Sequence, residues 1–314
     1  MSPNELRQPT LRRAQYALKR TLPPGGRRVL RQAGWAFTRL TSFARLLPTF
    51  IVVGGQRCGT ASLYAYLLEH PAVAGFFSKQ IYFFDAKFDR GVSWYRGHFP
   101  LATYRAYARH RFGAEPAIGE ATADYLFHPH AAARIRSLRP DARLIVLLRD
   151  PVARAFSHYH LFRAKGFEAL SFEEAVEREG ERLDGQLERM LDDPSYWSAS
   201  RHTFSYLARG RYKEQLERWL AVFPPEQLLI LRSEDLFADP ASVMPGVFEF
   251  LGVPAMGGAA STYPVLHAQR YEPMKPETRA SLRRYFEQPN NELYSYLGRD
   301  FGWGPAEEAR RALA

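Results

Sequence analysis

Residues 50–64, FIVVGGQRCGTASLY, decide which fold this chain is expected to have. The apolar run at the start predicts a buried strand, a pair of glycines interrupts it, and a helix is expected to begin at Thr60. A strand, a glycine loop and a helix together form a common phosphate-binding arrangement. The usual nucleotide loop places Lys directly after its last glycine. Here Thr60 follows Gly59, and the basic residue, Arg57, comes two positions before that glycine.

The loop between the expected strand and helix has the features of an anion site. Gly54 and Gly55 permit a sharp turn, and Gly59 lets backbone amides approach an oxyanion. The free N–H groups and the dipole of the following helix favour a negative charge at its start. Arg57 adds a cation with a planar set of donors. Such a loop can also be purely structural, so its interpretation as a phosphate site depends on a second strand.

That second strand opens LIVLLRDPVARAFSHYH, residues 144–160. Its first five residues are typical of a central parallel strand, and Arg149 follows at the carboxyl end, where open α/β sheets bind ligands. Asp150 and Pro151 are typical of a helix start, with Ser157 two turns further on. Mg-dependent nucleotidases place an acidic residue at the strand exit. Arg149 therefore indicates a second phosphate without a metal, unless it pairs with a neighbouring acid, and a nucleotide with phosphates at both ends of its ribose is expected.

Strand-like and helix-like patterns alternate along the rest of the chain, which predicts one α/β domain. We expect a P-loop-like open parallel sheet flanked by helices, with a basic N-terminal helical arm. The expected strands are 50–54, 117–120, 143–148 and 227–231. The expected helices are 60–69, 128–138, 151–164, 171–180, 206–222, 240–251 and 276–297. Segment 181–205 has the least pattern and is interpreted as a surface insertion or a flap that faces the substrate. The expected boundaries are 1–48 for the arm, 49–303 for the domain and 304–314 for a tail.

The formal net charge of +10 is concentrated at the N-terminus. Residues 1–50 hold ten Lys or Arg and one acidic residue, so this segment carries +9 and the remainder of the chain +1. A nearly neutral body argues against a broad nucleic-acid surface, and no nucleic-acid partner is expected. The single cysteine, Cys58, rules out an intrachain disulfide and a cysteine-based metal site.

Apolar residues recur at helical spacing between Val29 and Leu47, with arginines between them. Three interpretations stay open: a helix docked on the body, peripheral contact of residues 27–47 with an anionic membrane, or a transit peptide that is removed. No apolar run approaches the roughly 20 residues that a membrane span needs, and the N-terminus lacks the apolar core of a secretory signal. The sequence therefore predicts a cytoplasmic protein, with peripheral membrane contact as an alternative.

The chain resembles the sulfotransferases that use 3′-phosphoadenosine 5′-phosphosulfate (PAPS), especially the branch that contains bacterial enzymes and the heparan sulfate sulfotransferases. The segment GGQRCGTASLYAYLLEHP resembles the 5′-phosphosulfate loop of that family. The segment LLRDPVARAFSHYHLFRAKGFEALSFEEAVERE resembles its 3′-phosphate segment. SKQIYFFD, GVSWYRGHFP and GEATADYLFHP occupy the places of three further family elements. The resemblance extends in order over roughly residues 49–303 and leaves out the arm.

The resemblance implies a role for each matching residue. It assigns the 5′-phosphosulfate to Arg57, Cys58, Gly59, Thr60, Ala61 and Ser62. It assigns the 3′-phosphate to Arg149 and Ser157, and it matches Arg270, with Tyr271 beside it, to a late basic loop that closes over the nucleotide. Arg57 also receives a catalytic role, because the family generally has Lys there, in contact with the bridging oxygen as charge moves onto the leaving phosphate. Ala61 replaces a common Thr and loses one hydroxyl donor.

Gln80, in SKQIYFFD, is the departure that matters most, because the heparan sulfate enzymes carry Glu there as the general base. A side-chain amide can bond the acceptor but cannot take its proton, a transfer that contributes about 10²–10⁴-fold to the rate. Glu120 is our first choice for another base, followed by Asp85, Asp124 and His160. Two alternatives stay open: an acceptor that needs less help, such as a phenol or amine, or a protein that binds nucleotide without turnover.

The resemblance thus implies a sulfotransferase that moves the sulfonate of PAPS to a hydroxyl or amine, in line and without a metal. Carbohydrate, glycolipid and small-molecule acceptors all stay open. A PAPS-binding protein without turnover, a kinase of similar topology and a protein that binds nucleic acid through the arm are the alternatives. Thr60 in the lysine position counts against the kinase. Six aromatic residues are expected either to line an acceptor cleft or to pack in the core: Tyr82, Phe83, Phe84, Trp94, Tyr95 and Tyr125.

Overall fold

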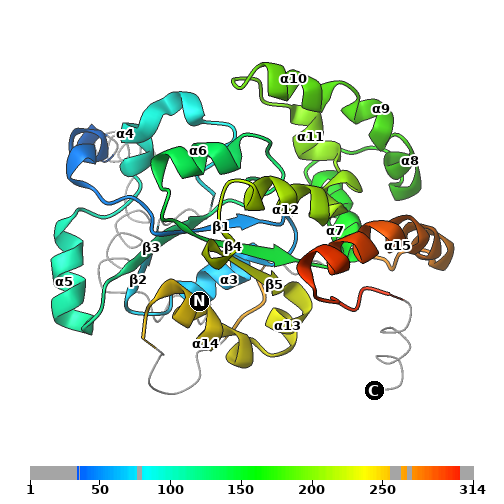
Figure 1. Ribbon diagram of the computed structural model, residues 1–314. Helices are drawn as coiled ribbons and strands as arrows, with labels where there is room; N and C mark the ends of the chain where they lie inside the picture. The colour runs from blue at the N-terminus through cyan, green and yellow to red at the C-terminus, as the bar shows by residue number, and fades with distance from the viewer. Residues whose placement is uncertain (1–33, 35, 76–79, 255–262, 267–270, 305–314) are drawn as a thin grey trace, which may run out of the picture.

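A five-stranded sheet forms the centre of the computed structural model, which describes residues 34, 36–75, 80–254, 263–266 and 271–304 (Figure 1). All of its strand pairs are parallel, and the strand order is β2-β3-β1-β4-β5. The strands are β1 (Phe50–Gly54), β2 (Val73–Gly75), β3 (Ala117–Ala121), β4 (Arg143–Leu148) and β5 (Leu228–Arg232). The open parallel sheet flanked by helices that the sequence predicted is confirmed.

Both faces of the sheet are buried under helices. Successive side chains of a strand point to opposite faces, so Ile51 belongs to one apolar cluster and Val52 to the other. The first cluster is covered by α6 (Ala131–Leu138), α12 (Tyr212–Leu220) and α15 (Pro276–Leu297). The second is covered by α3 (Thr60–Leu67), α13 (Ser233–Ala238) and α14 (Pro240–Leu251) on the opposite side (Figure 1). Burial on both faces explains why the central strands are continuous apolar runs in the sequence.

The long elements agree closely with the sequence prediction. The four predicted strands lie within one residue of β1, β3, β4 and β5, and α14 and α15 have the predicted bounds. Helix α7 (Pro151–Ala164) also begins as predicted, because the Asp150 side chain accepts a hydrogen bond from the Val152 amide at 2.9 Å. The prediction missed β2, whose three residues are too few to give an apolar run.

Several predicted helices are divided or shorter in the structure. The helix predicted at 171–180 is two helices, α8 (Phe172–Glu177) and α9 (Glu179–Leu183), and the one predicted at 206–222 begins only at Tyr212. Segment 181–205 is more regular than its pattern indicated, since α10 (Gln186–Asp192) and α11 (Ala199–Phe204) lie within it. The remaining elements are α4 (Gly91–Arg96), α5 (Thr103–Phe112), η2 (Ser42–Ala44), η3 (Phe88–Arg90), η4 (Ala208–Gly210) and η5 (Pro225–Gln227).

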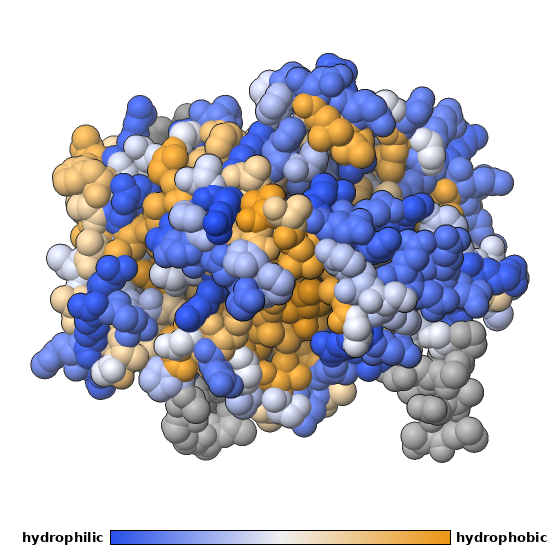
Figure 2. Space-filling view, in the orientation of Figure 1, coloured by the Kyte–Doolittle hydropathy of each residue, from blue (hydrophilic) through white to orange (hydrophobic). Residues whose placement is uncertain are grey.

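Only the last part of the predicted arm helix lies within the described residues. Positions 36–40 are helical, η2 follows, and the chain is extended at Arg45, so the prediction of a helix that continues to Leu47 is wrong. The apolar side chains of this part are not docked on the body, and Figure 2 shows hydrophobic surface over it at the left edge. The exposed fractions are 55% for Phe37, 75% for Leu40 and 79% for Phe43.

Candidate functional site

A cavity of about 1090 Å³ opens at the carboxyl ends of the parallel strands. Its walls include residues that follow β1, β3, β4 and β5, so segments far apart in the sequence meet at one edge of the sheet. The charged residues that line it are mostly basic, which gives the cavity a positive field suited to an anion. They are Arg57, Arg149, Lys165, Arg232, Arg279 and Arg283, against the acidic Asp150 and Glu234.

The start of α3 forms one wall of the cavity through Thr60 and Ala61. Gly59 precedes the helix with φ 91°, a left-handed conformation that glycine adopts without strain. A Cβ at Gly59 would lie 2.6 Å from the Phe237 ring, so the close approach of this loop also requires glycine. Arg57 is left-handed as well, with φ 67°, which is strained for a residue with a side chain. The helix amides and the Arg57 guanidinium therefore face the same space, as an anion site requires.

The two predicted phosphate ends are in direct contact. The Arg57 Nε atom donates a hydrogen bond to the Ser157 hydroxyl at 3.0 Å, and the Arg149 Nη1 atom donates to the Arg57 carbonyl at 3.1 Å. The Tyr212 hydroxyl donates a hydrogen bond to the Arg149 carbonyl at 2.8 Å and so helps to fix the loop after β4. Burial lowers the pKa of Arg57, and the nearby Arg149 lowers it further, although Tyr271 opposes the shift. An anion between the two guanidinium groups would relieve their repulsion.

The structure brings together seven of the predicted site residues, which all line this cavity: Arg57, Gly59, Thr60, Ala61, Gln80, Arg149 and Ser157. Two others have side chains that are buried in the fold and do not line the cavity. The Cys58 thiol is fully buried, its amide donates to the Gly55 carbonyl, and burial raises its pKa to about 11. The Ser62 hydroxyl is also fully buried, where it accepts a hydrogen bond from the Leu266 amide at 2.9 Å. Both side chains are thus used by the fold, and Arg270 lies outside the described residues.

Glu120, the first choice for the base, also lies away from the cavity. It lies in the interior of β3, fully buried, and outside the cavity lining. Three hydroxyl groups donate to its carboxylate: Tyr95 at 2.7 Å, Thr122 at 2.7 Å and Tyr125 at 3.1 Å. Burial raises the pKa of Glu120 to about 7, against these hydrogen bonds. A carboxylate enclosed in this way cannot reach an acceptor hydroxyl in the cavity.

The other candidate bases also lie outside the cavity lining. Asp85 is 7% exposed, and burial followed by the charge of Asp124 raises its pKa to about 8. The His160 ring stacks on Tyr271, with ring centroids 4.1 Å apart. Asp124 is 5% exposed, but it lies beside the cavity, because its Oδ1 atom is 3.3 Å from Nδ1 of His202, which does line it. Sequence reasoning missed His202, because it falls in the segment with the least pattern.

The aromatic residues divide between core and cavity. The core contains Phe83, Phe84, Tyr95 and Tyr125, all fully buried, and Trp94 packs against their cluster. Tyr82 lines the cavity, and its hydroxyl donates to the Gln80 side-chain oxygen at 2.5 Å. An acceptor in this cavity would therefore meet an aromatic face at Tyr82 next to the amide of Gln80.

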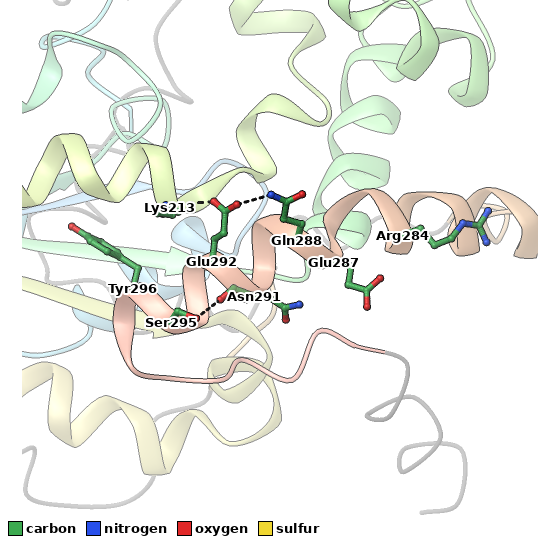
Figure 3. Close-up of a pocket in the computed structure, with 8 residues that line it drawn as sticks. All are labelled: Lys213, Arg284, Glu287, Gln288, Asn291, Glu292, Ser295 and Tyr296. Atoms are coloured by element: carbon green, nitrogen blue, oxygen red, sulfur yellow. Dashed lines mark hydrogen bonds and ion pairs between the residues drawn. The ribbon is translucent and has the colours of Figure 1, made fainter.

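A second, more open groove runs along α15 opposite Lys213 of α12 (Figure 3). Lys213 Nζ is 3.4 Å from Oε2 of Glu292, and Gln288 donates to the same carboxylate at 2.9 Å. The Lys213 charge is thus already paired, and the described residues of this groove include none that was predicted to bind the nucleotide.

The described ranges hold neither a cluster of metal-ligating side chains nor a helix that could span a membrane. Three or more His, Cys, Asp or Glu side chains do not gather there in a group that could hold a metal ion. The helices in those ranges are too short or too polar to cross a membrane.

Comparison with known proteins identifies similar sequences. The sequence model of the sulfotransferase domain family matches residues 47–297. The membrane-associated sulfotransferase kil1 of Dictyostelium discoideum is 32% identical, over 82% of this chain and 66% of its own length. The heparan sulfate glucosamine 3-O-sulfotransferase 6 of Mus musculus is 31% identical, over 82% of this chain and 74% of its own length. This chain thus spans slightly less than two thirds of the Dictyostelium protein.

A solved structure is similar as well. The crystal structure of a sulfotransferase from Alicyclobacillus acidocaldarius matches with a TM-score of 0.61 and 29% identity. The match covers 82% of this chain and 99% of that chain. The range matched by the family model includes both loops of the cavity that carry arginine, after β1 and after β4.

Proposed function

This chain belongs to the sulfotransferase family, and we propose that it transfers the sulfonate group of PAPS to a hydroxyl or amine of an acceptor. One observation carries the proposal: Arg57 and Arg149 follow neighbouring parallel strands, line one cavity and are linked by a hydrogen bond from the Arg149 guanidinium to the Arg57 carbonyl. A nucleotide with a phosphate at each end of its ribose would meet one arginine at each end.

The size and charge of the cavity support PAPS as the donor. Pockets for small molecules measure about 300–1,000 Å³, so about 1090 Å³ leaves room for a nucleotide and part of an acceptor. The lining has six basic and two acidic residues, and this excess of positive charge attracts the negative phosphosulfate and the second phosphate. Trp303 and Phe237, which also line the cavity, offer apolar surface for a base.

We propose in-line displacement without a metal. The acceptor oxygen or nitrogen attacks sulfur, the bond from sulfur to the bridging oxygen breaks, and its electron pair stays on the 5′-phosphate. Arg57 and the amides at the start of α3 stabilise that charge as it develops, at positions that are fixed before the reaction. Removal of one such donor typically lowers kcat by about 10²–10³.

We propose a carbohydrate as the acceptor, with a glycolipid or a small molecule as further candidates. The 3-O-sulfotransferase among the relatives is named for glucosamine of heparan sulfate. The aromatic face of Tyr82 beside the Gln80 amide supports a ring with hydroxyl groups at this wall of the cavity.

Gln80 itself favours a second candidate function. A glutamine at the cavity wall cannot take a proton from an acceptor, so the alternative is a protein that binds PAPS or its desulfonated product, PAP, without turnover. The two functions share the nucleotide site and differ only in product formation.

The test uses the full-length protein with labelled PAPS and three probes: heparan sulfate oligosaccharides, a glycolipid and p-nitrophenol. We expect a labelled product, identified by its mass, and its loss in Arg57→Ala. Arg105→Ala is the matched control, because Arg105 lies on α5 and its side chain is 48% exposed. PAP binding with no product from any probe supports the binding protein. Failure to bind PAP contradicts both functions.

We also propose that residues 27–47 make peripheral contact with an anionic membrane, and the described positions 36–45 hold the side chains that support this. The exposed Phe37, Leu40 and Phe43 offer apolar anchors, while Arg39 and Arg45 carry positive charge beside them. One relative is named as membrane-associated.

The single cysteine, Cys58, is a free thiol, which fits a reducing compartment such as the cytoplasm.

A further inference from the structure

The proposed transfer needs a group that accepts the proton of the acceptor, and neither Gln80 nor Glu120 supplies it. We propose that His202 is this general base and that Asp124 positions it. The proposal rests on the proposed function, since it names the base of the same site. It assigns a role to α11, in the segment where the sequence showed the least pattern.

The imidazole of His202 is held on several sides. Its Nδ1 atom faces Oδ1 of Asp124 at 3.3 Å, so Nε2 is the nitrogen left to accept a proton. The edge of the ring also meets Phe162, with centroids 5.4 Å apart, and Trp197 lies at 5.3 Å. The side chain keeps 23% exposure and lines the cavity. A fixed ring with one nitrogen turned to a carboxylate is the arrangement of a histidine base and its orienting acid.

Asp124 is itself fixed in its charged form. Burial opposes its ionisation, but Arg209 and His202 together lower the pKa of Asp124 to about 2. Arg209 donates to Oδ1 at 2.8 Å, and the Gln56 amide approaches the same oxygen at 3.4 Å. Asp124 therefore stays ionised at neutral pH and favours the tautomer of His202 that carries its proton on Nδ1.

The location of His202 fits the path of the acceptor. It lines the same cavity as Gln80 and Tyr82, which form the wall proposed for the acceptor, and as Arg57 at the phosphosulfate end. Gln80 then has a role that an amide can fill, a hydrogen bond to the acceptor that orients it. The enclosed Glu120 lacks this access, since it is 0% exposed.

The step is balanced in atoms and charge. The lone pair of the acceptor oxygen attacks sulfur, the proton of that hydroxyl moves to Nε2 of His202, and the electron pair of the broken bond stays on the bridging oxygen of PAP. His202 leaves the step as an imidazolium, which the Asp124 carboxylate stabilises. The proton passes to solvent after the products leave.

The first test compares His202→Gln with the wild type on two acceptors. A saccharide hydroxyl needs a base, whereas p-nitrophenol is already ionised in mildly alkaline buffer. We expect kcat for the saccharide to fall about 10²–10⁴-fold and kcat for p-nitrophenol to change less than about tenfold. A similar fall for both acceptors, or a loss below about fivefold for the saccharide, would overturn the proposal. Exposed His110 on α5 provides the matched control, His110→Gln, which should leave both rates unchanged.

The second readout is the pH profile of kcat/KM. A general base must be unprotonated to act, so the acid limb of the wild-type profile should be absent in His202→Gln. Among the other charged or titratable groups, His158 within α7 interacts with His202, and Arg209 in η4 shares its partner Asp124. Arg201 precedes His202 on α11, and Lys165 at the end of α7 lines the same cavity. An unchanged acid limb in His202→Gln would contradict the proposal.

PAP affinity and melting temperature separate this inference from the proposed function. In His202→Gln, PAP affinity should stay within about twofold of the wild type and the melting temperature within a few degrees, because the histidine is assigned to the acceptor side. If the wild type binds PAP but sulfates no probe, the transferase proposal fails before any variant is made. If the wild type turns over and His202→Gln turns over equally well, only the assignment of the base fails.

Discussion

Three hydroxyl groups surround the carboxylate of Glu120, and this shows how one residue can serve the fold where chemistry was expected. Tyr95, Thr122 and Tyr125 donate to it inside a sheet whose two faces are both covered by helices. The cost of burying a charge there is visible in its pKa, which burial raises to about 7. Glu120 therefore affects stability through its protonation, and this effect can be measured.

Glu120→Gln should weaken the pH dependence of stability. The folded-state pKa is raised from 4.5 to about 7, so the stabilisation is complete below about pH 4.5 and is lost as the pH rises through about 7. At about 1.4 kcal/mol per pKa unit, the wild type should lose on the order of 3 kcal/mol relative to the variant between pH 5 and 8. Urea unfolding across this range measures the difference.

A neighbouring carboxyl group and a control variant bear on how the Glu120→Gln result is interpreted. Asp85, whose burial raises its pKa to about 8, is present in both proteins, but the charge of Glu120 also acts on it, so the comparison reports the Glu120 carboxylate together with its coupling to Asp85. Glu120→Leu is the control, because it leaves three buried hydroxyl groups without their acceptor and should destabilise the protein at every pH. Parallel stability curves for the wild type and Glu120→Gln would show that the carboxylate does not titrate in this range.

At the scale of elements, the junction between β1 and α3 depends on two requirements at Gly59. The backbone is left-handed there, and the Phe237 ring leaves no room for a Cβ. Gly166 shares only the first requirement, with φ 77° and nothing within 4 Å of the added atom. Alanine substitutions at Gly59 and Gly166 therefore separate the free-energy cost of a left-handed backbone from the cost of the steric clash with Phe237.

Gly59→Ala should therefore cost more than Gly166→Ala. Left-handed backbone alone costs a residue with a Cβ about 1–2 kcal/mol, which is the expected loss for Gly166→Ala. The contact of 2.6 Å with Phe237 adds to this in Gly59→Ala and should also weaken PAP binding at least tenfold. Urea unfolding and calorimetric titration with PAP give the two numbers. Equal losses would mean that the Phe237 ring moves aside at little cost.

The exposed segment 36–44 leads to a prediction about membranes. The triple variant Phe37→Ser, Leu40→Ser, Phe43→Ser should bind vesicles of phosphatidylserine and phosphatidylcholine at least tenfold more weakly than the wild type. Burial of each side chain is worth about 1.5–3 kcal/mol, and the residues are 55%, 75% and 79% exposed in the free protein. Sedimentation with vesicles measures the binding.

The control for this variant is Phe167→Ser, because Phe167 is also exposed, at 63%, but follows α7 in another part of the molecule. It should bind vesicles as the wild type does. Rising salt should weaken the binding of the wild type, since charge contributes to it. Equal binding by the wild type and the triple variant would exclude this segment as the contact.

At the scale of the whole molecule, the site exists because four parallel strands end at one edge of the sheet. The loops after β1 and β4 supply Arg57 and Arg149, and α7 brings Ser157 to the same point. Arg149 and Ser157 are 92 and 100 positions from Arg57 in the sequence, yet both form a hydrogen bond with it. A nucleotide that contacts both Arg57 and Ser157 should therefore couple the effects of substitutions at these two residues.

A double-mutant cycle with PAP measures this coupling. Arg57→Ala and Ser157→Ala should each weaken PAP binding, and their effects should be non-additive by about 0.5–3 kcal/mol, because the two side chains are 3.0 Å apart. The pair Arg57→Ala and Arg105→Ala is the control and should be additive within about 0.5 kcal/mol. Additive effects of Arg57 and Ser157 would indicate that their contact does not persist with the nucleotide bound.

The sequence by itself determined four of the five strands and the edge of the sheet at which Arg57 and Arg149 lie. The apolar runs of β1 and β4 are local signals of buried parallel strands, and Asp150-Pro151 is a local signal of a helix start. Because parallel strands end at the same edge, the position of Arg57 and Arg149 after two such runs was enough to predict that they meet. No distant contact had to be known for these conclusions.

Only the tertiary structure decided which side chains face the cavity. Cys58 and Ser62 each lie two residues from Thr60, but the core buries the Cys58 thiol and the Leu266 amide donates to the buried Ser62 hydroxyl. Glu120 is enclosed by residues from other segments, and His202 reaches the cavity because α7 and the loop after β3 pack around it. Exposure and orientation depend on neighbours that are remote in the sequence, and residue order alone does not specify those neighbours.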